Sequence, residues 1–388
     1  MKKRVLSLLM VGVLAGALLT GCGKSDNKAA DNNGGSVTQE EKKDDAAAGE
    51  GSYTIASSTW GAGAYPLDDI VSNNQYLCNI IGGTLDVANN EFTADKVVSN
   101  LENQLANNPD GVLIQTMAQT TFGQEISDVS AKNLPFAFDS NFPEDESLVE
   151  KCYSIESFCG GVCSNPYEMG VAMAELAYAD GHRTAVTTGA ALGDYSHDNR
   201  MKGFKETFEK LGGTFLQDAH CADPSEAVAK TNDLLTANPD VDCIYATGGD
   251  YLSACATIKE SRSDLDVAIY GTDIDPTLNP YIEDGTVTAM NGGQGVCGSI
   301  AITLIVNYLD GHQILDADGK APLFDNLNVF TITGENAAGF QKLYDAGANL
   351  VGDDNYKKLL YRYNPDVTIE TYNEVLEGYA ESVYGRLE

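Results

Sequence analysis

Two short apolar stretches near residue 280 each run into a polar residue that could hydrogen-bond a ligand. Residues 267–270 predict a buried parallel strand, and Asp273 follows it after a Gly-Thr turn. Residues 287–290 predict a second strand that runs into Asn291 and two flexible glycines. Open α/β sheets bind ligands outside the carboxyl ends of their strands, so both side chains are candidate ligand groups. Asp is also common in turns, and Asp273 alone could equally be a turn residue or a helix cap.

Apolar runs of strand length alternate with helical patterns along residues 53–388, a stretch too long for one ordinary core. Strands are expected at 53–57, 80–86, 111–115 and 134–138, and in a second series at 184–188, 214–217, 243–246, 267–270 and 287–290. Helices are expected at 67–78, 94–107, 121–132, 166–179, 198–211, 224–237 and 251–260. This βαβ succession predicts an α/β protein with two Rossmann-like lobes, each built on a parallel sheet.

The layout of residues 266–291 resembles the type I periplasmic binding proteins, and within them the ribose-type sugar-binding components of ABC transporters. The shared features are a strand that ends in Gly-x-Asp and a later strand that ends in an amide. The resemblance implies two lobes joined by a multi-crossover hinge, with a ligand cleft between them. It also implies that Asp273 contacts sugar hydroxyls and that Asn291 contributes its amide just before the chain crosses between lobes.

The resemblance implies three further ligand positions in the first series of strands. It places an aromatic residue after the first strand, a polar side chain after the third and an aspartate after the fourth. The residues at these places are Trp60 or Tyr65, Gln115 and Asp139. Residues 61–66 differ from the Asn-Pro-Phe type loop of the family, so either aromatic residue could take the first position.

In the second series, residues 194–204 (DYSHDNRMKGF) resemble the family's Arg-x-x-Gly-Phe motif at the start of a helix. The match implies that Arg200 points into the cleft; without it, a solvated helix residue is the simpler interpretation. Gly249 replaces the asparagine that the family usually has before its Ala-rich helix. Asp250 could therefore contact ligand or cap the helix, and capping is the preferred interpretation. Asn165, in the loop after the first expected crossing, is a weaker candidate.

The same resemblance sets the expected domain boundaries. The N-terminal lobe comprises residues 53–155 and 292–328, and the C-terminal lobe comprises residues 156–291 and 329–388, including a C-terminal extension. Crossings between lobes are expected near 154–157, 291–293 and 328–331. An apolar helix at 296–309 should return to the first lobe, and a strand at 328–332 toward the second. The seven tyrosines of the last fifty residues are expected to pack helices on the outside.

The N-terminus has the pattern of an export signal. Three basic residues precede an apolar run at 5–19, which is short for a membrane span and ends in Leu-Thr-Gly-Cys. This ending resembles a bacterial lipobox, which implies that residues 1–21 are removed and that Cys22 is acylated. Residues 22–52 are poor in branched apolar and aromatic residues, and predict a flexible tether. The chain would then be attached to the outer face of the cell membrane through the lipid on Cys22.

Composition and motifs exclude several function classes. The formal net charge of −33 argues against nucleic acid or an anionic membrane surface as a partner. The four histidines are scattered, and no hydrolase, zinc-protease or phosphate-loop motif is present, so we expect no enzymatic activity, cofactor or metal. Apart from Cys22, eight cysteines remain, and free thiols are favoured over a disulfide framework in a chain of this length.

The residue types of the expected site suit a sugar. Carboxylates and a guanidinium form charge-assisted hydrogen bonds with neighbouring hydroxyls, and an aromatic face covers the C–H side of a sugar ring. The leading hypothesis is a lipoprotein that captures a sugar-like solute and delivers it to an ABC permease. Two alternatives stay open: a ligand-sensing module for a membrane receptor or kinase, and a surface hydrolase.

Overall fold

A computed structural model describes residues 52–63, 65–262 and 264–387. The expected export signal, Cys22 and all but the last residue of the expected tether lie outside the described residues. Among the described residues, no helix is both long and apolar enough to cross a membrane.

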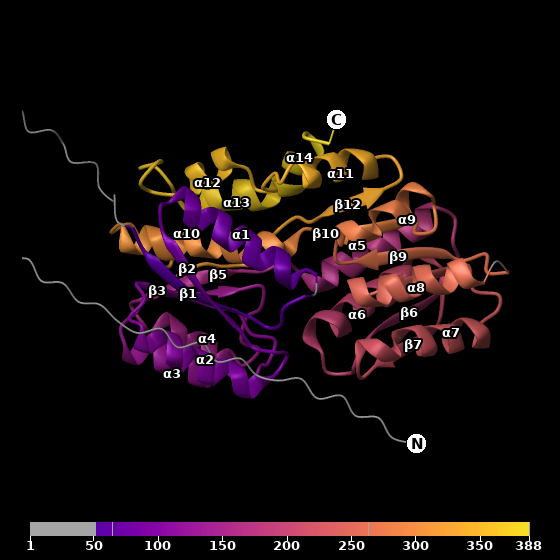
Figure 1. Ribbon diagram of the computed structural model, residues 1–388, viewed down its shortest axis with the longest axis horizontal. Helices are drawn as coiled ribbons and strands as arrows, with labels where there is room; N and C mark the ends of the chain where they lie inside the picture. Colours follow the sequence, from indigo (N-terminus) through magenta and orange to yellow (C-terminus); the bar gives the residue numbers. More distant parts are fainter. Residues whose placement is uncertain (1–51, 64, 263, 388) are drawn as a thin grey trace, which may run out of the picture. The chain divides into compact units, whose positions relative to one another are not determined.

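The first of two sheets has the strand order β11-β5-β4-β3-β1-β2, and every neighbouring pair in it is parallel (Figure 1). Its strands are β1 (Thr54–Thr59), β2 (Thr84–Asn89), β3 (Gly111–Ile114), β4 (Phe136–Asp139), β5 (Phe158–Val162) and β11 (Leu323–Phe324). Helices α1 (Leu67–Ile80), α2 (Ala94–Ala106), α3 (Phe122–Ala131) and α4 (Glu146–Tyr153) connect successive strands. This sheet and its helices form the first lobe.

The second sheet has the order β12-β10-β9-β8-β6-β7, with β12 antiparallel to β10 and the other pairs parallel. Its strands are β6 (Thr184–Ala190), β7 (Thr214–Cys221), β8 (Cys243–Ala246), β9 (Ala268–Thr272), β10 (Ala289–Gly292) and β12 (Phe330–Thr333). Its helices are α5 (Pro166–Ala179), α6 (Tyr195–Leu211), α7 (Ala227–Ala237), α8 (Gly249–Ser261) and α9 (Asn279–Glu283). The predicted α/β fold with two similar lobes is confirmed.

The first crossing between lobes comes later than the sequence predicted. The expectation placed it near residues 154–157 and began the C-terminal lobe at 156. Residues 158–162 instead form β5, which pairs with β4 in the first sheet, so the chain leaves the first lobe only after Val162. This strand contains two consecutive glycines, one of them with φ of +108°, and its register shifts against β4. Glycine in a strand interior is the mark of a bulge, and it hid the strand from pattern analysis.

Helix α10 (Cys297–Leu309) carries the chain back to the first lobe and is buried there. Residues 297–307 are all buried, as expected for a helix that is apolar on every side. A polar stripe of Ser299, Thr303 and Asn307, spaced four residues apart, interrupts this apolar surface. Ser299 accepts a hydrogen bond from Tyr356 at 2.7 Å, Thr303 pairs with Tyr372 at 2.6 Å, and Asn307 donates to the Leu359 carbonyl at 2.8 Å. The C-terminal helices therefore hydrogen-bond to this stripe.

The expected boundaries assigned the C-terminal helices to the second lobe, but these helices contact both lobes. They are α11 (Ala337–Asp345), α12 (Asp353–Leu359), α13 (Ile369–Glu377) and α14 (Tyr379–Tyr384). Helix α12 contacts α10 of the first lobe, whereas α11 and α14 contact β12 of the second. The Tyr379 hydroxyl donates to the Gly293 carbonyl at 3.0 Å, and the Asn328 backbone N–H donates to the Leu376 carbonyl at 3.1 Å. The extension therefore contacts two of the crossings between lobes.

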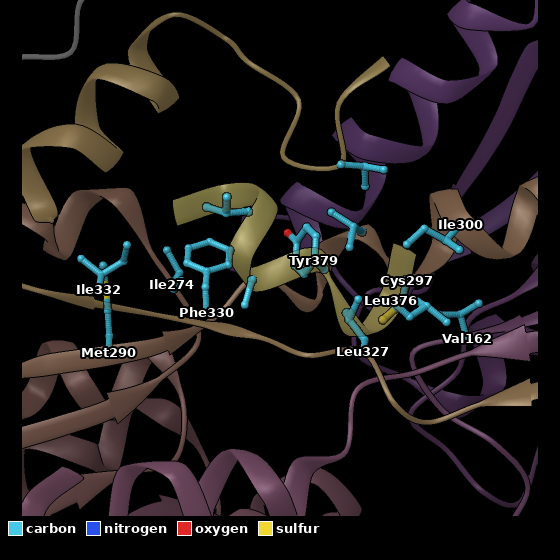
Figure 2. Packing of buried hydrophobic residues seen from close by; sticks show 14 of the residues in the cluster. Val162, Ile274, Met290, Cys297, Ile300, Leu327, Phe330, Ile332, Leu376 and Tyr379 are labelled. Carbon is cyan, nitrogen blue, oxygen red and sulfur yellow. The ribbon is translucent and has the colours of Figure 1, made fainter. Parts of the chain in front are cut away.

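One apolar cluster runs through this region and joins the two lobes. In Figure 2, Val162, Cys297 and Ile300 lie on one side and Phe330, Ile332 and Met290 on the other, with Leu327 and Tyr379 between them. Three of the extension's tyrosines, Tyr356, Tyr372 and Tyr379, are buried. The interpretation of these tyrosines as packing residues is confirmed for them.

Candidate functional site

A buried ion pair lies at the carboxyl end of the second sheet. The Arg200 guanidinium contacts both carboxylate oxygens of Asp273, with Nη1 3.2 Å from Oδ2 and Nη2 3.1 Å from Oδ1. The Arg200 and Asp273 residues are only 6 % and 5 % exposed. Arg200 also donates to the Thr247 carbonyl at 2.8 Å. This fork geometry fixes both charges at the carboxyl end of the sheet.

Two glycines explain how Arg200 reaches this position. Helices α5 and α6 pack with their backbones in close approach: a Cβ on Gly170 would lie 2.1 Å from the Arg200 carbonyl oxygen, and one on Gly203 would lie 2.1 Å from the Tyr167 carbonyl oxygen. The glycine of the Arg-x-x-Gly-Phe motif therefore lets α6 sit close enough to α5 to bring Arg200 to Asp273. Phe204, the next residue of the motif, is fully buried and stacks on Tyr245 at 4.7 Å.

Asp273 itself has an unusual backbone. It directly follows β9 with φ of +74°, in the left-handed region that few residues other than glycine adopt. Asp tolerates this conformation better than most residues, at a conformational cost of about 1 to 2 kcal/mol. Strain of this kind persists where the surroundings hold it, and it concentrates at ligand-binding positions. Ser140, at the end of β4 in the first sheet, has φ of +63°.

Gln294, which none of the sequence motifs indicated, completes the polar group around Asp273. Its Nε2 donates to Asp273 Oδ1, and the residue is 5 % exposed. It lies in the short 3-10 turn between β10 of the second lobe and α10 of the first. The Oε1 atom of Gln294 and the Nε atom of Arg200 are both buried without a hydrogen-bond partner among the described residues. Buried polar atoms are normally paired, so this region lacks one donor and one acceptor contact.

In the first lobe, Gln115 organises the loop that follows β1. It is completely buried, its Oε1 accepts from the Trp60 amide at 2.9 Å, and its Nε2 has no partner among the described residues. Trp60 in turn accepts at its carbonyl from the amide of Phe92 at 2.8 Å. Phe92 is 51 % exposed, and its ring fills the space where Gly61 has no side chain. Exposed and half-buried aromatic residues thus follow β1 and β2, as a sugar-ring cover requires.

Asp139 lies inside the first lobe rather than on its surface. It has no exposed area, and its Oδ1 accepts from the Ser140 hydroxyl at 2.7 Å. Within the described part of the chain, Asp139 Oδ2 and Asn74 Oδ1 have no hydrogen-bond partners, and they lie 2.4 and 2.6 Å from where a Cβ on Gly298 would be. Burial raises the pKa of Asp139 to about 7, and the Ser140 hydrogen bond opposes this only in part. A protonated Oδ2 would be a donor beside the Asn74 acceptor.

Comparison with known families decides what kind of protein carries this site. Residues 72–313, more than half of the chain, match the family model described as a periplasmic binding protein domain. The chain belongs to this family. No curated protein matches its sequence.

Solved structures of periplasmic binding proteins share the fold. A ribose ABC transporter protein from Conexibacter woesei aligns with a TM-score of 0.64 and 19 % identity, over 78 % of this chain and 99 % of its own. A carbohydrate transporter protein from Acidothermus cellulolyticus, in complex with myo-inositol, aligns with a TM-score of 0.64 and 16 % identity, over 77 % of this chain and 100 % of its own. A glucose-galactose binding protein from Geobacillus stearothermophilus aligns with a TM-score of 0.62 and 17 % identity, over 74 % of this chain and 99 % of its own. The expected resemblance and fold are therefore confirmed, and membership in a family of binding proteins supports the expectation that the chain is not an enzyme.

Two of the expected ligand residues of this periplasmic binding protein have other partners. Asn291 is completely buried, its Oδ1 accepts from the Thr272 hydroxyl at 2.8 Å, and its Nδ2 donates to the Met169 carbonyl at 2.9 Å. Both ends of the Asn291 amide are used inside the second lobe, whereas Gln294, three residues later, contacts Asp273. Asn165 caps α5 by accepting from the amides of residues 167 and 168.

Asp250 and Tyr65 also differ from expectation. Gly248 is the N-cap of α8 and no side chain caps that helix, so the preferred capping role of Asp250 is wrong. Asp250 is exposed, and partial desolvation together with the nearby Asp273 carboxylate raises its pKa. The Tyr65 hydroxyl lies 2.7 Å from that of Tyr344 in α11, so Tyr65 connects the first lobe to the extension. Trp60 is therefore the better candidate for the expected aromatic position.

Proposed function

We propose that the protein captures a sugar or sugar-like molecule between its two lobes and delivers it to an ABC permease. The observation that carries the proposal is the buried Arg200–Asp273 pair with its unpaired neighbours. Nε of Arg200 is a donor and Oε1 of Gln294 is an acceptor, and both are buried without partners among the described residues. A hydroxyl group accepts one hydrogen bond and donates another, so a polyhydroxyl ligand supplies what both atoms lack.

Electrostatics at the site favour an uncharged ligand of this kind. The single guanidinium of the pair is already neutralised by Asp273, and the Asp250 carboxylate lies nearby. An anionic ligand would lose its hydration shell without finding an unpaired positive charge, whereas hydroxyls bind to ionised partners through charge-assisted hydrogen bonds. Trp60 and Phe92 of the first lobe would cover the apolar face of the ring from the other side. The glucose-galactose binding protein, the ribose transporter protein and the carbohydrate transporter protein in complex with myo-inositol support the same ligand class.

The delivery role rests on the family and on the way the lobes are connected. Periplasmic binding proteins act outside the cytoplasm, and the proposed lipid on Cys22 would hold this one at the membrane beside its permease. Gln294 lies on a crossing between lobes and touches Asp273 directly, so ligand at Asp273 would act on the hinge. Rotation about such crossings would bring Trp60 toward the bound sugar, and the permease would recognise the resulting form.

A thermal-shift screen tests the binding proposal. The panel contains D-glucose, D-galactose, D-ribose, L-arabinose and myo-inositol, with glycerol as a control that carries hydroxyls but no ring. A sugar present at one hundred times its dissociation constant is expected to stabilise the protein by about 2.7 kcal/mol, whereas glycerol at the same concentration should give no shift. Absence of a shift for every sugar, with no binding heat in calorimetry, would contradict the proposal.

A further inference from the structure

A histidine that the sequence analysis set aside lies against the Arg200–Asp273 pair. His197 is in the first turn of α6, three residues before Arg200, and residues at this spacing share one face of a helix. Its Nδ1 is 2.8 Å from the Thr247 hydroxyl, and Thr247 also holds Arg200 through its carbonyl. The ring meets Tyr251 edge to face with a centroid distance of 5.4 Å. Two elements of the second lobe therefore fix the orientation of the imidazole.

Gly248 shows that the imidazole and the Asp273 carboxylate share one space. A Cβ on Gly248 would lie 2.6 Å from His197 Cε1 and 3.4 Å from Asp273 Oδ2. The absence of a side chain at this position leaves room for the imidazole beside the carboxylate. The loop after β8 therefore packs against both side chains.

The outer nitrogen of His197 is available to a ligand. Nδ1 faces Thr247, but Nε2 has no hydrogen-bond partner among the described residues, and the side chain is only partly buried. Burial and the adjacent Arg200 charge lower the pKa of His197 below its ordinary value, and the Asp194 and Asp273 carboxylates oppose this in part. These effects favour the neutral ring, which has one donor and one acceptor nitrogen. Depending on the tautomer, Nε2 can donate a hydrogen bond to a hydroxyl or accept one from it.

We propose that Nε2 of His197 hydrogen-bonds a ring hydroxyl of the bound sugar, next to the hydroxyl that Asp273 and Arg200 hold. This inference rests on the proposed sugar-binding function and adds a specificity-determining residue to it. A histidine held at Nδ1 and free at Nε2 selects for a hydroxyl at one position of the ring. A sugar that lacks that hydroxyl leaves the nitrogen unpaired and binds less tightly.

Two substitutions separate a ligand contact from a structural role. In His197→Asn the amide occupies the position of Nδ1, so the Thr247 hydrogen bond survives while the outer nitrogen is lost. In His197→Gln the longer side chain places a polar group near Nε2 instead. His182→Asn is the matched control: His182 is also partly buried and edge to face with a tyrosine, Tyr270, but it precedes β6 at the opposite end of the strand.

Calorimetry is performed on the whole protein with the panel sugar that gives the largest heat, and with the monodeoxy analogues of that sugar. His197→Asn should keep its melting temperature and lose at least tenfold in affinity, His197→Gln should lose less, and His182→Asn should bind like the unaltered protein. One analogue should bind the His197→Asn variant as tightly as the parent sugar does, because it lacks the contacted hydroxyl.

Two results would overturn the inference while leaving sugar binding intact. One is an affinity of His197→Asn within twofold of the unaltered protein. The other is an equal loss for the parent sugar and for every monodeoxy analogue, which would show that His197 acts only on the shape of the site. If the Asn variant melts early, the analogue profile of His197→Gln decides between the same two results. Failure of every panel sugar to bind the unaltered protein would instead remove the proposed function, and this inference with it.

Discussion

Asp273→Asn should abolish most sugar binding and destabilise the fold, because it removes one partner of a buried ion pair. The substitution keeps the shape of the side chain, and Asn tolerates the left-handed backbone at this position. Losing the charge-assisted hydrogen bonds to ligand is expected to cost about 2 to 3 kcal/mol of binding, close to one hundredfold in affinity. Leaving the Arg200 guanidinium buried and unpaired is expected to cost about 3 to 5 kcal/mol of folding stability. Chemical denaturation and calorimetry measure the two effects.

A surface pair of the same composition provides the control. Arg262 and Asp264 are 2.9 Å apart, but the Asp264 side chain is 68 % exposed. Asp264→Asn should change stability by less than about 1 kcal/mol and leave binding unaffected, since solvent screens such pairs. The double variant Arg200→Met, Asp273→Asn removes the unpaired charge, and should regain stability without regaining affinity. Normal sugar affinity in Asp273→Asn would show that the site has been placed at the wrong strand ends.

Asp139→Asn should stabilise the protein at pH 7.5 and leave sugar binding within about threefold. The folded state holds the carboxyl proton up to about pH 7, whereas the unfolded chain loses it near pH 4. Folded protein therefore binds more protons between these values, and this residue makes stability fall as the pH rises from about 4 to about 7. The raised pKa of Asp139 therefore lowers the free energy of unfolding by about 4 kcal/mol at neutral pH, at 1.4 kcal/mol per pKa unit. Asparagine avoids that cost, and its amide can donate to the unpaired Asn74 oxygen.

The measurement is the free energy of unfolding between pH 4 and 8. The unaltered protein should show the fall, and Asp139→Asn should show a flatter profile. Glu102→Gln removes the same charge from an exposed position on α2 and should leave the profile unchanged. A stable Asp139→Asn variant that binds no sugar would restore Asp139 as a ligand residue, as the sequence had suggested.

Strands and helices with regular patterns could be predicted from the sequence, whereas irregular ones could not. The runs that became β8 and α5 were predicted with their bounds, because apolar strand composition and a Pro at the helix start are local signals. Strand β5 was missed because of its glycines, and β11 because two residues give no period. The position of the C-terminal helices depends on the Ser299, Thr303 and Asn307 stripe. Polar residues that recur every four positions on an otherwise apolar helix could have indicated that another part of the chain packs there.

The sequence indicated candidate side chains at strand ends, but which of them lie together depends on tertiary contacts. Arg200 and Asp273 were each expected at the ligand cleft, and they form an ion pair because both lie at the carboxyl end of one sheet. Asn291 was expected at the site because it follows a strand, yet its side chain turns inward to Met169, and Gln294 contacts Asp273 instead. His197 could have been found from its three-residue spacing to Arg200. The burial of Asp139 and the exposure of Phe92 have no local signal, because both depend on how helices from distant parts of the chain cover the sheet.

The central claim is that a sugar binds between the lobes and that the lobes close on it. The most direct test is a single titration with the best panel sugar, followed by Trp60 emission and by small-angle scattering. Trp60 is the only tryptophan in the sequence and follows β1, so its emission reports on the first lobe alone, while the Arg200–Asp273 pair belongs to the second. We expect the emission to change saturably and the radius of gyration to fall over the same range of sugar concentration. Calorimetric binding that changes neither the emission nor the radius would contradict the claim.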